Sequence, residues 1–326
     1  MRYLLGRLGF YAIAAWVAIT LNFFLPRLMP GDPATALFAR FKGRLPPEAM
    51  AGLREAFGLT GGSLLSQYGT YLAHLARGDL GTSIVYFPQP VSHVVGRAIL
   101  WTLFLSGASL VLSFGIGTGL GIVAAWRRGG WVDRWVPPVL AFAGAFPYFW
   151  LAMVALYILG YRAHLFPVGY AYDPDLTPGF TLEFAADVVR HAILPVASVV
   201  LASSGGWMLT MRSSMIVTTG SDFVRLANAR GLPMRRVVLR YAAQNAVLPS
   251  VTGLGMAIGF ALGGSLLTEI VFSYPGTGFL LVQAVRSQDY ALMQGIFLVI
   301  TLAVLGANWA VDILNTWLDP RTKDAQ

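Results

Sequence analysis

Two acidic residues inside apolar stretches are the first candidates for chemistry in this sequence. Glu269 and Asp312 each lie near one end of a long apolar run. Charged groups are costly inside a bilayer, so acids in such positions often relay protons or bind ions. The pair therefore leaves open a carrier driven by a proton gradient. Asn308 and Asp312 also share a helical face, where a hydrogen bond to a neighbouring helix is the simpler role.

Hydrolytic and metal chemistry find little support in the remaining residues. Ser203 or Ser204 with His191 could suggest a serine protease, but no G-x-S-x-G elbow surrounds either serine. The histidines show neither an H-E-x-x-H pattern nor paired metal-ligand spacing; they are His74, His93, His164 and His191. Cysteine is absent, so disulfides and thiolate metal sites are excluded.

A P-loop nucleotide-binding site in this chain is also excluded. A P-loop needs a Gly-Lys pair, and the only lysines, Lys42 and Lys323, follow Phe41 and Thr322. If ATP and Mg²⁺ drive this protein, they must be bound by another subunit, and we expect no cofactor here.

The composition predicts an all-α integral membrane protein. Of 326 residues, 56% are hydrophobic and 12% are charged, far from the balance of a soluble domain. A spanning helix needs about 20 mostly apolar residues. Six runs meet that need and predict about six transmembrane helices: 8–28, 98–126, 135–161, 191–211, 248–272 and 292–314.

Basic residues orient these helices. The first run ends without a small-x-small cleavage site, which favours an uncleaved helix over a signal peptide. Arginines cluster in alternate loops, which puts the N- and C-termini and the segment 212–247 in the cytoplasm. The net charge of +8 lies largely at helix ends, where anionic membrane lipids, and not nucleic acid, explain it.

The segment SDFVRLANARGLPMRRVVLRYAAQNAVLP, residues 221–249, is basic and helix-forming between two apolar runs. Ser221 can cap a helix, Gly231 suits a left-handed C-terminal residue, and Pro233 suits the first turn of a second helix. We expect one face to hold Phe223, Leu226, Ala227 and Arg230. Such a short helix needs a partner, either lipid headgroups or a groove in a soluble protein.

Small and helix-breaking residues predict how the spans pack. Glycines at four-residue spacing favour close helix contacts: Gly115 with Gly119, Gly117 with Gly121, and Gly255, Gly259 and Gly263. Pro147 and Pro195 favour a kink or a broken turn. The patch Ser203, Ser204, Gly205 and Gly206 serves interhelical hydrogen bonding or lines a pathway.

The loop after the first run is too long for a simple turn. Met50, Leu53 and Phe57 have helical spacing, which suggests a short amphipathic helix that docks a partner. A second apolar stripe is more typical of packing on the membrane or the scaffold; it comprises Leu64, Tyr68, Tyr71, Leu72 and Leu75.

The basic segment also carries a family resemblance. Its residues resemble the EAA loop of ABC importer permeases, in the variant of the dipeptide/oligopeptide/nickel family: Asp222 to Arg225, Ala227 to Gly231, Arg235-Arg236, and Asn245 to Pro249. Further family motifs occur in order along nearly the whole chain: Pro30 to Ala34, Gly78 to Gly81 with Ser83, Phe272 to Gly276, Asp289-Tyr290, Asn308, Asp312, and Asp319 to Arg321. The sequence is similar to the first of the two permeases of such systems. Asn228, where a basic residue is more usual, and Thr60-Gly61-Gly62 depart from the pattern.

The resemblance implies a type I ABC importer (MetI-like) permease fold with a long extracytoplasmic loop after helix 1. Its divisions would be an N-terminal transmembrane helix (1–29), an extracytoplasmic region (30–97), a permease core (98–316) with the coupling loop 212–247, and a cytoplasmic tail (317–326). The expected partners are a second homologous permease, two ABC ATPases and an extracytoplasmic solute-binding protein in a prokaryotic plasma membrane.

The resemblance also assigns the coupling residues. A coupling helix that sits in a groove of one ATPase would consist of Asp222, Phe223, Val224, Arg225, Leu226, Ala227, Asn228, Ala229, Arg230 and Gly231. The expected cargo is di- or oligopeptides, with nickel chelates, glutathione and oligosaccharides as alternatives. No residue would do covalent chemistry, and the sequence does not identify substrate-binding residues.

Overall fold

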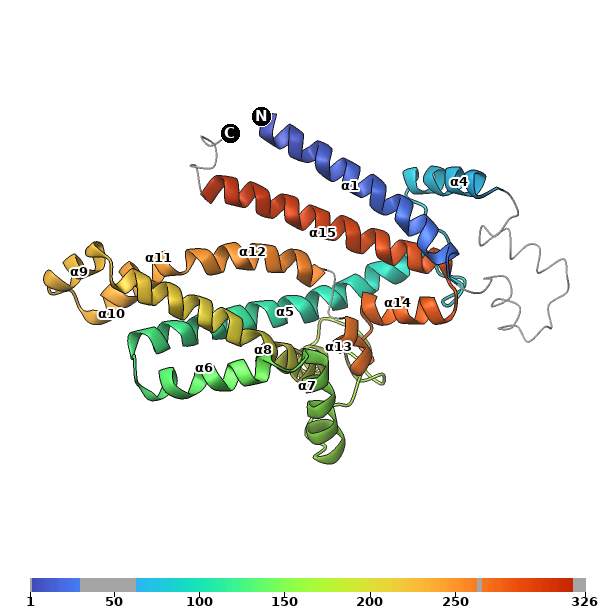
Figure 1. Cartoon of the computed structure of the whole chain (residues 1–326). Helices are drawn as coiled ribbons and strands as arrows, with labels where there is room; N and C mark the ends of the chain where they lie inside the picture. Colours follow the sequence, from blue (N-terminus) through green and yellow to red (C-terminus); the bar gives the residue numbers. More distant parts are fainter. Residues whose placement is uncertain (1, 30–62, 263–265, 319–326) are drawn as a thin grey trace. The chain divides into compact units, whose positions relative to one another are not determined.

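The computed structural model describes residues 2–29, 63–262 and 266–318, and these residues form helices and no β-strand (Figure 1). They divide into two compact units between which the chain passes several times. Unit 1 comprises Met1–Thr102, Leu262–Leu266 and Pro275–Trp309, and unit 2 comprises Leu103–Ala261, Leu267–Tyr274 and Ala310–Gln326.

Long helices dominate both units. Unit 1 contains α1 (Arg2–Arg27), α4 (Leu64–Ala76), the start of α5 (Val91–Trp126), α14 (Thr277–Arg286) and most of α15 (Tyr290–Leu318). Unit 2 contains the rest of α5 and, in order, α6 (Trp131–Gly144), α7 (Tyr148–Ala155), the π-helix η1 (Leu156–Arg162), α8 (Leu182–Thr219), α9 (Asp222–Ala229), α10 (Met234–Arg236), the π-helix η2 (Val237–Ala243), α11 (Gln244–Ala246), most of α12 (Leu248–Leu262) and most of α13 (Leu266–Val271).

Four helices in the described residues are long and apolar enough to cross a membrane: Gly9–Arg27, Val91–Trp126, Leu182–Thr219 and Tyr290–Val311. A fifth crossing is formed if the pair Trp131–Gly144 and Tyr148–Arg162, bent by 96°, counts as one span. The all-α membrane fold is therefore confirmed, but the count of six is not. The predicted run 248–272 contains the shorter apolar helix Leu248–Gly259 and the separate α13, with residues 263–265 outside the description.

Several predicted boundaries need correction. Helix α5 begins at Val91 instead of 98, and α8 begins at Leu182 instead of 191. Pro147 does break the predicted run 135–161, because it precedes α7 at the 96° bend. Pro195 does not break α8, which continues to Thr219. The predicted helix around Met50 to Phe57 and the motifs at 30–34, 60–62 and 319–321 lie outside the described residues.

Close packing in unit 2 explains some of the glycine repeats. A Cβ on Gly117 would lie 2.6 Å from the Ser204 carbonyl oxygen of α8, and one on Gly121 would lie 2.7 Å from that of Met208. Any larger side chain at these positions would push α5 and α8 apart. A Cβ on Gly115 or Gly119 would meet open space. The repeat of Gly115 and Gly119 therefore has no packing role within the described part of the chain.

A buried carboxyl group organises one corner of unit 1. Asp289 is fully buried, and its Oδ2 accepts hydrogen bonds from the Ser83 hydroxyl (2.6 Å) and the Val85 N–H (3.0 Å). Its Oδ1 accepts from the Leu292 N–H (3.0 Å) in the first turn of α15. Two motifs 206 residues apart in sequence, one containing Ser83 and the other Asp289-Tyr290, thereby meet at one point.

The stripe on α4 packs on the scaffold, as the sequence favoured. The Tyr68 hydroxyl lies 2.7 Å from Thr20 Oγ1 on α1. The rings of Tyr68 and Tyr71 lie 5.1 and 5.6 Å from the ring of Phe23, which is fully buried. Leu64, by contrast, remains 56% exposed.

Candidate functional site

The predicted helix–turn–helix of residues 221–246, called the elbow below, is present in unit 2. Helix α9 begins after Ser221, whose backbone is extended (ψ 153°), as an N-cap requires. The Ser221 side chain does not accept an N–H bond, however, and instead donates to the Thr218 carbonyl (2.5 Å). Ser221 therefore starts the helix by its backbone conformation, while its hydroxyl ties the start of α9 to the end of α8.

The turn after α9 follows from two residues. Gly231 has φ +71°, a left-handed conformation that glycine adopts at little cost. Pro233 lies immediately before α10, and the chain then continues as the π-helix η2. The sharp turn is confirmed, and the second helix differs from expectation only in its wider π geometry.

The two faces of α9 differ from the predicted division. Val224 and Ala227 are 2% and 3% exposed, so they form the inward face. Phe223 and Leu226 are 44% and 54% exposed, on the side of the helix next to that face. Ala227 does lie beside Phe223 and Leu226 around the helix, as the spacing predicted, but Ala227 is buried and the two larger side chains are exposed. The edge of the buried side therefore runs through the predicted face.

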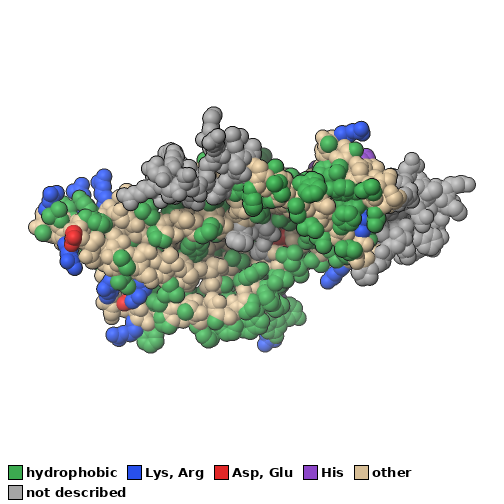
Figure 2. Space-filling model, turned by 45° about the horizontal axis from the view of Figure 1, so that its top comes forward, with side chains coloured by type: hydrophobic (Ala, Val, Ile, Leu, Met, Phe, Trp, Pro, Cys, Tyr) green, Lys and Arg blue, Asp and Glu red, His purple; other side chains and the backbone are tan. Residues whose placement is uncertain are grey.

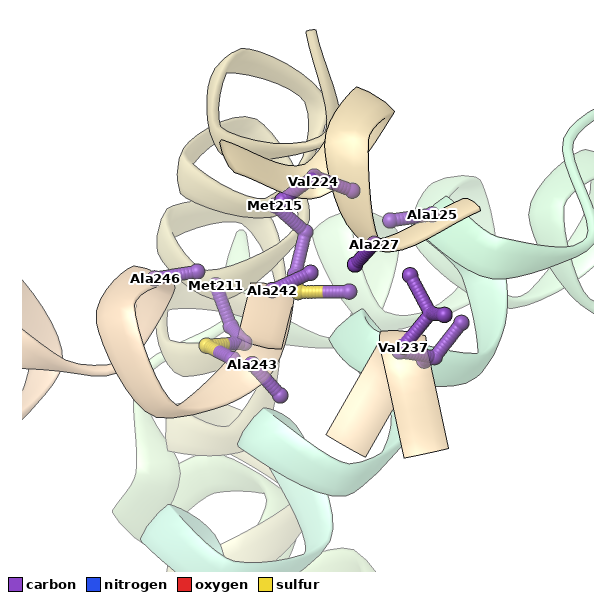
Figure 3. Close-up of a cluster of buried hydrophobic side chains, with 10 residues drawn as sticks. Ala125, Met211, Met215, Val224, Ala227, Val237, Ala242, Ala243 and Ala246 are labelled. Atoms are coloured by element: carbon purple, nitrogen blue, oxygen red, sulfur yellow. The ribbon is translucent and has the colours of Figure 1, made fainter. Parts of the chain in front are cut away.

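The inward face of α9 joins a buried apolar cluster, called the elbow core (Figure 3). Its members come from the end of α5, from α8, from α9 and from the chain after Pro233: Ala125, Met211, Met215, Val224, Ala227, Val237, Val238, Ala242, Ala243 and Ala246. Half of these ten residues are alanines, which let the backbones approach closely, while methionine fills irregular gaps. A displacement of α9 should therefore also move α5 and α8, whose side chains pack in the same cluster.

The exposed surface of the elbow carries both apolar and basic side chains. Phe223, Leu226 and Met234 are exposed, and so are Arg225 and Arg230. Asp222 is the only acid between 221 and 247, against five arginines, and its contact with Arg225 is long (4.0 Å) and exposed. Figure 2 shows basic side chains gathered at the left, where α9 and α10 lie.

An ion pair that sequence reasoning missed lies near the elbow. Asp133 Oδ1 accepts a hydrogen bond from Arg212 Nε at 2.7 Å, and Asp133 Oδ2 accepts one from the Gly129 N–H at 2.9 Å. This ion pair between Asp133 and Arg212 links the start of α6 to α8. Because 79 residues separate the two partners, no local pattern signals it.

The other candidate residues do not assemble into a catalytic site within the described residues. Glu269 is fully buried on α13, and Asn308 is half-buried on α15, while the side chain of Asp312 lies outside the description. The Ser204 hydroxyl donates to the Val200 carbonyl of its own helix (2.6 Å). His191 Nδ1 contacts the Asp187 carbonyl oxygen (2.9 Å), so no serine–histidine pair forms.

The polar patch on α8 divides between two environments. Ser204 and Gly205 are buried, and a Cβ on Gly205 would lie 3.0 Å from the Leu140 carbonyl oxygen of α6. Ser203 and Gly206 are exposed on the other side of the helix. The buried half packs helices together, and the exposed half leaves a polar strip at mid-helix.

Comparisons with known proteins agree with the all-α membrane fold. Residues 117–324 match the family described as binding-protein-dependent transport system inner membrane component. The chain is 36% identical over 325 residues to a putative peptide permease protein of Brucella suis biovar 1 (strain 1330), covering 99% of each chain. It is 33% identical over 328 residues to a probable D,D-dipeptide transport system permease protein of Escherichia coli (strain K12), covering 96% of this chain and 94% of that one.

A further relative is named for a different cargo. The chain is 34% identical over 325 residues to a glutathione transport system permease protein of Salmonella typhi, covering 98% of each chain. The family match covers well over half of the chain and includes α8, the elbow and α12. The chain therefore belongs to the binding-protein-dependent transport system inner membrane components, the multi-pass permease subunits of ABC importers, which have no ATPase site of their own and work with ATPase and binding-protein partners.

Proposed function

We propose that this chain is the permease subunit of an ATP-driven importer of di- or oligopeptides. Two relatives that align over most or all of the chain are named for peptides or dipeptides, which supports that cargo. A third relative is named for glutathione, itself a tripeptide, so small peptides are the shared chemistry. Nickel chelates and oligosaccharides remain the alternative cargoes.

The proposed assembly pairs this chain with a second, homologous permease, two ATPase subunits and an extracytoplasmic binding protein. Substrate passes between the two permeases by alternating access. The arginine-rich loops, the elbow and both termini face the cytoplasm, and residues 30–97 lie outside. Residues 98–316 form the core, and 317–326 form a cytoplasmic tail.

Coupling to ATP is proposed to run through the elbow. One observation carries this proposal: Phe223 and Leu226 of α9 are exposed, while Val224 and Ala227 of the same helix are buried in the elbow core. An exposed apolar pair on a two-turn helix fits a groove in a partner protein. Closure of the ATPases then pushes on Phe223 and Leu226, and the elbow core passes that displacement to α5 and α8.

Reconstitution in proteoliposomes tests the function. We expect ATP-dependent uptake of a labelled dipeptide only when the second permease, the ATPases and the binding protein are all present. Unlabelled tripeptide should compete, whereas nickel chelates and oligosaccharides should not. Peptide uptake by the complex without ATP would contradict the proposal.

A proton-coupled carrier is the second candidate, and the full burial of Glu269 favours it. That mechanism requires uptake by this chain alone under an imposed pH gradient, and it requires Glu269→Gln to abolish uptake. Our proposal instead predicts no uptake by the chain alone. It also predicts that ATP-driven transport by the assembled Glu269→Gln complex does not depend on the pH gradient.

A further inference from the structure

The corner between α5 and α6 is unusually rich in tryptophan and arginine. Trp131 is 73% exposed, Trp135 is 55% exposed, and Trp126 at the end of α5 is 39% exposed. Three arginines accompany them: Arg127, Arg128 and Arg134. Ten residues, 126–135, thus combine large amphipathic rings with cations, the pairing typical of side chains at a membrane–water boundary.

Helix α6 presents these rings on a face that the rest of unit 2 leaves uncovered. Its inner face packs on α8, where Leu140 and Ala143 are buried and the Leu140 carbonyl approaches Gly205. The opposite face continues from the tryptophans into the apolar span, through Val139 (57% exposed) and Phe142 (69% exposed). The spacing of Trp131, Trp135, Val139 and Phe142 places them on one helical face.

The charge at the corner is not balanced from within the segment. Asp133 is the only acid between residues 126 and 144. Its two oxygens accept hydrogen bonds from Arg212 Nε and from the Gly129 N–H, and its charge also interacts with that of Arg128, so several arginines share this one carboxylate. The arginines beside the tryptophans therefore leave a positive site at the polar end of an apolar face.

We propose that this corner is a binding site for an anionic phospholipid. Arg127 and Arg128 bind the phosphate of the headgroup, for which the guanidinium fork is well suited. The rings of Trp131 and Trp135 lie at headgroup level, and the acyl chains follow Val139 and Phe142. The order of features along the face, basic, then aromatic, then aliphatic, matches the order of headgroup, boundary and chain in a lipid.

This site lies close to the elbow, since Ala125, two residues before Arg127, belongs to the elbow core. A bound lipid would hold the end of α5 at the level of the headgroups while α9 is displaced against the same core. The inference goes beyond the proposed function and is tested by a binding readout that does not need transport.

Lipid retention by the assembled complex, in nanodiscs of mixed phosphatidylglycerol and phosphatidylcholine, tests the site. After detergent extraction, native mass spectrometry should find phosphatidylglycerol retained about 30-fold more weakly by the double variant Arg127→Ala/Arg128→Ala, since each arginine near the surface contributes about a fivefold preference. The variant Arg235→Ala/Arg236→Ala removes the same charge from α10, where no exposed tryptophan is adjacent in the described chain, and should retain the lipid. Equal retention by all three proteins would overturn the proposal.

Fluorescence quenching locates the lipid on the tryptophan face. The chain has nine tryptophans, so the signal of this face is the difference between the wild type and Trp131→Phe/Trp135→Phe. Dibrominated phosphatidylglycerol should quench this difference signal more than dibrominated phosphatidylcholine, and the preference should vanish in Arg127→Ala/Arg128→Ala. Quenching by neither lipid would mean that another protein covers the face. Equal quenching by both lipids in the wild type would mean that lipid contacts the face without a headgroup site. Either result overturns the proposal.

Discussion

Two regions of this chain are held together by opposite means. The corner around Asp289 in unit 1 is a buried polar network, in which one carboxyl group accepts from Ser83, Val85 and Leu292. The elbow core in unit 2 contains ten apolar side chains, rich in alanine and methionine. A hydrogen bond holds its donor and acceptor within a narrow range of distance and angle. A methionine side chain, by contrast, can adopt several conformations and fill gaps of different shapes. We therefore expect the corner to stay fixed and the elbow core to tolerate small displacements while remaining packed.

Removing the carboxyl group of Asp289 should give the largest loss of stability. Asp289→Ala leaves a buried hydroxyl and two N–H groups without their acceptor, which should cost about 3–5 kcal/mol. Thermal unfolding of the purified chain measures the effect. Ser83→Ala keeps the two N–H bonds to Asp289 but removes the acceptor of the Tyr86 N–H (3.1 Å), and it should cost about 1–2 kcal/mol. Equal losses in the two variants would show that the carboxyl group is not the centre of the corner.

Truncating a side chain in the elbow core should have a somewhat smaller effect. Met215→Ala opens a cavity at a fully buried position and should cost about 2–4 kcal/mol, while Met215→Leu should cost less than about 1.5 kcal/mol. Met234→Ala, at a 55% exposed position in the same elbow, is the matched control and should stay within about 0.5 kcal/mol. If Met215→Leu were as damaging as Met215→Ala, the core would be rigid and the contrast with the Asp289 corner would fail.

The smallest effect is expected at an exposed carboxylate near the corner. The Gly81 N–H, which donates to Asp79 Oδ1 (2.9 Å), and then the His74 ring (2.8 Å from Oδ2) hold the pKa of Asp79 below its usual range. The folded state is thus stabilised above the unfolded pKa, about 3.9, and this contribution is lost as the pH falls below it. Both partners are about half exposed, so the contribution should stay below about 1 kcal/mol.

Unfolding at pH 6 and pH 3 checks this linkage. Asp79→Asn removes the titrating group, so the variant should lose less stability between the two pH values than the wild type does. An identical loss in the two proteins would show that the contacts of Asp79 do not affect folding.

Local chemistry in the sequence predicted the elbow well. Gly231 and Pro233 determine the turn by their own backbone preferences, and the structure places the turn there. Which part of the apolar side of α9 is buried was not predicted: Val224 and Ala227 are buried, while the neighbouring Phe223 and Leu226 are exposed. Only the tertiary contacts of Ala227 with the elbow core decide which face is buried.

Long-range contacts could not be predicted from patterns. Ser83 and Asp289 each belong to a motif that the family resemblance singled out, but nothing local indicates that they bond to each other. Asp133 and Arg212 carry no signal at all. Hydropathy predicted six spans because it registers apolar length alone, whereas Pro147 bends one of these runs and residues 248–262 form only a short apolar helix.

The central claim, that Phe223 and Leu226 dock on an ATPase from the cytoplasmic side, can be tested by cysteine labelling. The chain has no cysteine, so Leu226→Cys introduces a single thiol. In inside-out vesicles, a membrane-impermeant maleimide should label this thiol readily when the chain is present without the ATPase. We expect labelling to be much slower in the assembled complex, because the ATPase groove covers the side chain.

Asn228→Cys is the control on the same helix, because Asn228 is exposed but points away from Leu226. We predict that the ATPase protects the thiol of the Leu226→Cys variant much more strongly than it protects the thiol of the Asn228→Cys variant. Labelling of Leu226→Cys at the same rate with and without the ATPase, or labelling only from the outer side in right-side-out vesicles, would contradict the account.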